Sequence, residues 1–136
     1  MQDNNKITVL IVEPEKAPRI AQIEETLEAM QSVVGGLIEE IMPFDDEVAI
    51  VCNEEGKING LELNRALYND DGELMDIVAG TFFVCSAPFD SEKFESLTPE
   101  QQQKFMKRFE KPEMFIPTTG GTKVIPFQTK NKDYER

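Results

Sequence analysis

Three short apolar runs constrain the fold of this chain more than any other feature. They cover residues 6–12, 48–52 and 77–87, are rich in β-branched residues, and are bordered by acidic residues or prolines. Runs of this length and composition favour strands of a sheet over long helices. Because the other strand signals come in hairpin-sized groups and helix signals are few, the sequence predicts an α+β fold with a mostly antiparallel sheet.

The first half of the chain predicts two pairs of strands. Residues 6–12 and 19–23 are separated by the turn-like sequence EPEKAP, which indicates a hairpin. Residues 37–42 and 48–52 are joined by a proline and three consecutive acidic residues, which suit an exposed connection.

The second half is less regular. Residues 58–67 fit either the end of a strand or a short helix. The run 77–87 predicts one central strand, in which Gly80 marks a bulge or a close backbone contact. Residues 114–116 and 123–127 predict two edge strands that pair weakly because prolines interrupt them.

Two segments carry helix signals. From Glu25, apolar residues recur at helical spacing until Gly35-Gly36, a pair that commonly ends a helix. Later, Thr98 predicts an N-cap, the next residue is a proline at the first helical position, and Gln101 completes a capping box. We expect these two main helices to pack on one face of the sheet.

The length of 136 residues fits one compact domain, since domains most often have about 100 to 150 residues. We expect a single α+β domain over residues 1–127 and a solvated C-terminal tail over residues 128–136. No apolar run is long enough to cross a membrane, and the first residues lack the pattern of a secretory signal. These features predict a soluble protein of the cytoplasm.

Charge is distributed very unevenly along the chain. Residues 1–20 carry no net charge, residues 21–100 carry −16 and residues 101–136 carry +4. Such a surface repels nucleic acid and anionic membranes but attracts basic proteins. We therefore predict an acidic face that binds a partner. Its expected members are Glu24, Glu25, Glu28, Glu39, Glu40, Asp45, Asp46 and Glu47.

Histidine is absent, which removes the usual general base near neutral pH and the commonest metal ligand. The glycine-containing loops match neither a calcium-binding EF-hand nor a phosphate-binding loop. We therefore expect no metal, no cofactor and no enzymatic activity. A hydrolase that uses two carboxylates stays as a third alternative, because acidic pairs are dense.

Arg65 suggests a second kind of binding site. It is one of few cations in the acidic stretch, and such an arginine either pairs with nearby carboxylates or anchors a small ligand. In the ligand alternative, Arg65 works with Asn53, Asn64 and the backbone at Gly35 and Gly36 to sequester a small nucleotide or signalling metabolite.

Several strings resemble a family of small proteins, the domain of unknown function DUF3846, which occurs in phages and bacterial mobile elements. The resemblance spans residues 7–84. The strings that carry it are Val34-Gly35-Gly36, Asn53-Glu54-Glu55-Gly56, Asn64-Arg65-Ala66 and Ala79-Gly80-Thr81-Phe82. The resemblance implies an accessory protein that acts in a bacterial host cell. Our leading expectation is a counter-defence protein whose acidic face docks on and blocks a basic, nucleic-acid-binding host protein.

Overall fold

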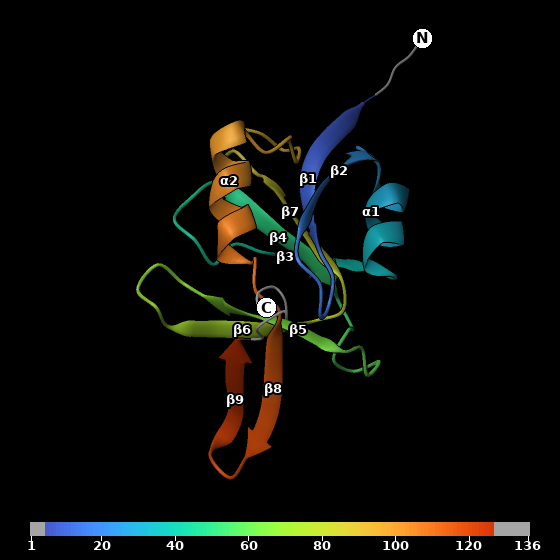
Figure 1. Cartoon of the computed structure of the whole chain (residues 1–136). Coiled ribbons are helices and arrows are strands. Elements are labelled where there is room, and N and C mark those ends of the chain that lie inside the picture. Colours follow the sequence, from blue (N-terminus) through green and yellow to red (C-terminus); the bar gives the residue numbers. More distant parts are fainter. Residues whose placement is uncertain (1–4, 127–136) are drawn as a thin grey trace, which may run out of the picture.

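The computed structural model describes residues 5–126, and a five-stranded antiparallel sheet forms its centre (Figure 1). The strand order is β2-β1-β7-β4-β3, so β2 and β3 are the edges of this main sheet. Its strands are β1 (Lys6–Val12), β2 (Arg19–Glu24), β3 (Ile38–Ile41), β4 (Val48–Asn53) and β7 (Phe82–Ser86). All neighbouring pairs are antiparallel, which confirms the predicted sheet and its first hairpin.

The two helices cover opposite faces of the main sheet (Figure 1). Helix α1 (Leu27–Val34) contributes Met30 and Val34 to the buried cluster that contains Val9, while α2 (Pro99–Arg108) contributes Phe105 to the cluster that contains Leu10. The expectation that both helices pack on one face is therefore wrong. The physical reason lies in the strands: their apolar runs are continuous rather than alternating, and such strands are covered on both sides.

Both helices begin where the sequence signals lie, and α1 also ends at its signal. The hydroxyl of Thr26 accepts a hydrogen bond from the backbone N–H of Ala29, and Gly35 ends α1 with a left-handed φ of 82°. Thr98 and Gln101 form the reciprocal capping box that the sequence predicts at the start of α2. These contacts satisfy backbone groups that helix termini otherwise leave without partners.

The apolar run 77–87 forms two strands rather than one central strand. It is divided by Gly80, whose φ of +85° turns the chain between β6 (Leu74–Ala79) and β7. Strand β6 pairs with β5 (Leu63–Tyr68) in a separate two-stranded sheet, so the ambiguous segment 58–67 ends in a strand. The positive φ of Gly80 favours glycine at this turn, and an added side chain would also meet the end of the Leu61 side chain.

A third sheet consists of the hairpin β8 (Glu113–Thr118) and β9 (Gly121–Pro126), which projects away from the main sheet (Figure 1). The predicted pairing of these strands is confirmed. The predicted tail, residues 128–136, lies outside the described residues. Within residues 5–126, no helix has the length and apolar character needed to span a membrane.

Candidate functional site

The acidic residues predicted to form one face lie on four different segments of the fold. Glu24 ends β2, whereas Glu39 and Glu40 lie on β3 at the opposite edge of the main sheet. Four strand spacings of about 4.8 Å put these edges roughly 19 Å apart. Glu25 and Glu28 lie at the start of α1, and Asp45, Asp46 and Glu47 lie in the loop before β4. The structure therefore does not bring the eight acids together on one surface.

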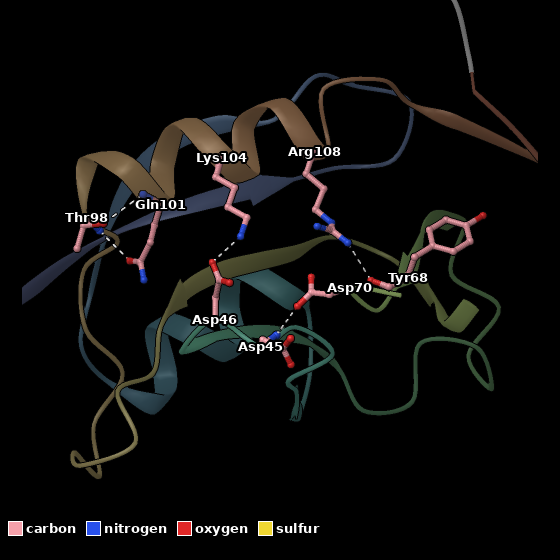
Figure 2. Close-up of polar contacts among 8 residues, drawn as sticks. All are labelled: Asp45, Asp46, Tyr68, Asp70, Thr98, Gln101, Lys104 and Arg108. Atoms are coloured by element: carbon pink, nitrogen blue, oxygen red, sulfur yellow. Dashed lines mark hydrogen bonds and ion pairs between the residues drawn. The ribbon is translucent and has the colours of Figure 1, made fainter. Parts of the chain in front are cut away.

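The acids of the loop before β4 are engaged in contacts within the chain (Figure 2). Lys104 Nζ of α2 donates to Asp46 Oδ2 at 2.8 Å, and the backbone N–H of Asp45 donates to Asp70 Oδ2 at 2.7 Å. That second bond lowers the pKa of Asp70, while the charge of Asp70 raises the pKa of Asp45. Glu47 Oε1 accepts from the backbone N–H of Phe89 at 2.7 Å.

A second cation of helix α2, Arg108, contacts the same region. Arg108 Nη2 donates to the backbone oxygen of Tyr68 at 3.0 Å, and its guanidinium lies 4.3 Å from the centre of the Phe44 ring (Figure 2 shows the first contact). Together with Lys104, this arginine attaches α2 to the loop and to β5. Asp46 thus helps to hold α2 in place, and the carboxylates of Asp46 and Glu47 are less available to a partner than those of β3.

Arg65 on β5 is almost completely buried, with 1% of its surface exposed. Its side chain has five N–H donors, and five hydrogen bonds within the chain use them. The acceptors are the backbone oxygens of Phe109, Lys16 and Asn64 and the side-chain oxygen of Asn64. Burial lowers the pKa of Arg65, and the nearby carboxylate of Glu113 opposes that effect.

The other residues of the predicted ligand pocket fall into two hydrogen-bonded groups. Asn64 Nδ2 donates to the backbone oxygens of Val12 and Gly80, beside Arg65. Asn53 Nδ2 instead donates to the backbone oxygen of Val34, where it lies against Gly36 and next to Gly35 at the end of α1. These side chains tie segments of the chain together, and their polar groups do not converge on one hollow.

A hollow of about 320 Å³ lies beside β3 on the face that α1 covers; we call it the Glu40 hollow. Phe89 contributes to its lining with 74% of its surface exposed, together with the acidic residues Glu40 and Glu92. Lys93 is 4.0 Å from Glu25 at the start of α1. The lining consists of Glu40, Met42, Ala87, Pro88, Phe89, Ser91, Glu92, Lys93 and Phe94.

A second hollow, of about 260 Å³, lies beside β3 on the face that α2 covers; we call it the Glu39 hollow. Lys57 and Asp76 form an ion pair of 2.6 Å there, which leaves Glu39 and Glu54 as its other charges. Burial raises the pKa of the Cys52 thiol to about 12, so this sulfur is a poor nucleophile at neutral pH. The lining consists of Glu39, Cys52, Asn53, Glu54, Gly56, Lys57, Ile58, Asp76, Ile77, Val78 and Ala79.

The backbone of β3 has one side free of strand partners in the described sheet. The N–H of Glu54 donates to the oxygen of Leu37 at 2.8 Å, and hydrogen-bonded pairs then alternate along the antiparallel ladder. Glu39 and Ile41 therefore direct their N–H and C=O groups toward β4. Ile38 and Glu40 direct theirs away from the sheet.

The sequence identified the acids of β3 but missed the apolar members of this site. Phe89 and Met42 are exposed at the Glu40 hollow, although both are apolar. The one available signal is an aromatic residue that directly follows a proline in a polar connection. Among residues 5–126, no group of three or more cysteines, aspartates and glutamates is arranged to hold a metal ion.

A comparison with models of protein families agrees with the resemblance seen in the sequence strings. Residues 7–110 match the model of the family described as Domain of unknown function (DUF3846). The chain belongs to this family. The match extends past residue 84, where the resemblance of the strings ends, and the DUF3846 part runs from β1 to α2. It includes β3, both hollows and Arg65, but not the hairpin of β8 and β9. Comparisons with curated proteins and with solved structures gave no match.

Proposed function

We propose that this DUF3846 protein is a non-enzymatic binding protein that docks on the basic surface of another protein through the β3 edge. The observation that carries the proposal is the Glu40 hollow, whose lining combines exposed Phe89 with the acidic residues Glu40 and Glu92. A hollow lined by an aromatic ring and carboxylates suits an arginine or lysine side chain, because the ring attracts the cation and the acids pair with it.

The partner we propose is a nucleic-acid-binding protein of a bacterial host. Proteins that bind DNA or RNA carry basic surfaces, and an acidic protein that covers such a surface blocks access to the nucleic acid. A counter-defence role in the host cytoplasm, in a phage or mobile element, agrees with the resemblance noted from the sequence. The net charge of −12 supports attraction over a distance, which salt weakens.

The experiment is a pull-down with the tagged full chain from host cells at low and high salt, followed by native mass spectrometry. The double variant Glu40→Lys/Glu92→Lys reverses the charges at the hollow. The matched control Asp71→Lys/Glu110→Lys changes the net charge equally at exposed positions elsewhere. We expect a basic partner that dissociates at high salt, is lost with the first variant and is retained with the control.

Three results would contradict this proposal. Equal loss of the partner with both double variants would mean that only net charge matters. A small-molecule adduct in the mass spectrum would favour the metabolite-sequestering alternative. Turnover of a substrate by the purified protein, abolished by replacing one carboxylate, would favour the hydrolase alternative.

A further inference from the structure

We propose that the β3 edge binds its partner by strand addition, with a basic extended segment forming a sixth strand of the main sheet. This inference rests on the proposed function and specifies how the partner is recognised. Ile38 and Glu40 direct their backbone N–H and C=O groups away from β4, so they offer hydrogen bonds to an incoming strand. Strand addition of this kind takes affinity from the backbone and specificity from alternate side chains.

The two hollows explain why such a segment is recognised on both sides. Glu40 and Glu39 are consecutive residues of a strand, so their side chains lie on opposite faces of the sheet, one in each hollow. An added strand also directs consecutive side chains to opposite faces. A segment with adjacent lysines or arginines therefore delivers one cation to each hollow, which selects paired basic residues.

The charges of the two edges favour this occupant at β3. Glu39 and Glu40 are both exposed and no described cation pairs with either, whereas the other edge, β2, carries Arg19 as well as Glu24. A second copy of this chain that paired through its own β3 would bring its Glu39 and Glu40 against these carboxylates. Like charges on neighbouring strands are destabilising, so β3 selects a basic strand over the β3 of a second copy.

The direct test uses a ten-residue peptide of alternating Lys-Lys and Val-Val pairs, with binding to the full chain measured by fluorescence anisotropy. One derivative carries N-methyl groups on every second residue, which removes the donors along one edge of the extended peptide, and the other carries them on every residue; both keep every charge. Because a strand donates to its neighbour along one edge only, the first derivative can still present its unmethylated edge to β3 and should bind like the parent peptide. The fully methylated derivative should bind about tenfold or more weaker.

A protein variant tests the same contact from the other side. Ile38→Pro removes one outward N–H without changing the charge, and edge strands accept proline where the N–H faces away from the ladder. Ile38→Val keeps the N–H and is the matched control. We expect about tenfold weaker peptide binding for Ile38→Pro only, with urea unfolding used to confirm that both variants are folded; if Ile38→Pro does not fold, the methylated peptides decide.

The outcomes separate the two proposals. Binding that is equal for all three peptides would overturn strand addition and leave the proposed charge-based docking intact. Failure of every peptide to bind would also overturn strand addition. Loss of the partner in the pull-down regardless of which acids are reversed would instead overturn the proposed function.

Discussion

Arg65 and the β3 edge are two polar regions of this molecule, and they differ in whether the chain itself satisfies their hydrogen-bonding groups. Arg65 is buried and donates five hydrogen bonds to atoms of the chain itself. The β3 edge carries exposed carboxylates and backbone groups that point away from its only described neighbour, β4. A polar group is available to a partner only where the protein has not already satisfied it, which favours β3 as the binding region.

The hydrogen bonds of Arg65 also link separate parts of the fold. Its hydrogen bonds join β5 to the turn after β1 and to the end of α2, through the backbone oxygens of Lys16 and Phe109. These segments are far apart in the sequence, and β5 belongs to a different sheet from β1. Arg65 therefore connects the small β5–β6 sheet to the main sheet and its helix.

The largest effect we predict is on stability, from the variant Arg65→Ala. It would leave buried carbonyl groups without donors and open a cavity, so we expect a loss of about 3–5 kcal/mol in the free energy of unfolding. Urea unfolding followed by circular dichroism measures it. Arg19→Ala, at a largely exposed arginine on β2, is the control and should cost less than about 1 kcal/mol.

The outcome also decides between the two interpretations of Arg65. If Arg65→Ala is as stable as the wild type and loses a bound metabolite, then this residue is a ligand anchor. Arg65 would then be available to a partner, as we infer for β3. If Arg65→Ala is strongly destabilised, the arginine is a structural element, as its hydrogen bonds indicate.

A smaller effect should distinguish the loop acids from the β3 acids. Asp46→Asn weakens the ion pair with Lys104 and should cost about 0.2–1 kcal/mol, because both groups are partly exposed. Glu40→Gln removes a charge that makes no ion pair in the described residues, so its free energy of unfolding should match the wild type within about 0.5 kcal/mol. Peptide binding should show the opposite order, with a larger loss for Glu40→Gln. A greater binding loss for Asp46→Asn would move the binding region from β3 to the loop.

Local sequence signals predicted most of the elements. The capping box at Thr98 and the glycine that ends α1 act within a few residues, and both lie where expected. The run 77–87 was harder to interpret, since a positive φ at Gly80 and a bulge leave the same signature in the sequence. The placement of the helices on opposite faces was also missed, although the continuous apolar character of β1 and β4 indicates burial on both sides.

The site could be predicted only in part because it depends on contacts between distant segments. The sequence identified Glu39 and Glu40 but could not show that they lie at an edge of the sheet, since strand order is set by long-range pairing. It suggested that Arg65 either pairs with carboxylates or binds a ligand. In the described residues Arg65 forms no ion pair, and all of its hydrogen-bond acceptors are neutral oxygens of the chain.

The smallest effect concerns Glu113, whose carboxylate interacts electrostatically with Arg65. Burial raises the pKa of Glu113 above 4.5, although a hydrogen bond from the N–H of Ala66 and the charge of Arg65 oppose this shift. The folded state thus holds the proton more tightly than the unfolded state. The stability contributed by protonated Glu113 is complete below pH 4.5 and is lost as pH rises through the folded-state pKa.

Glu113→Gln removes this titration and keeps a side-chain oxygen that accepts from Ala66. The free energy of unfolding of the wild type, relative to this variant, should therefore fall as pH rises from below 4.5 toward neutrality. Urea unfolding of both proteins across that range measures the difference, and Glu110→Gln, at an exposed position, controls for the loss of one charge. A difference that rises with pH would mean that attraction to Arg65 outweighs burial. Arg65 would then stabilise the fold partly through its charge. It would therefore differ less from the charged residues of β3 than its hydrogen bonds to neutral oxygens suggest.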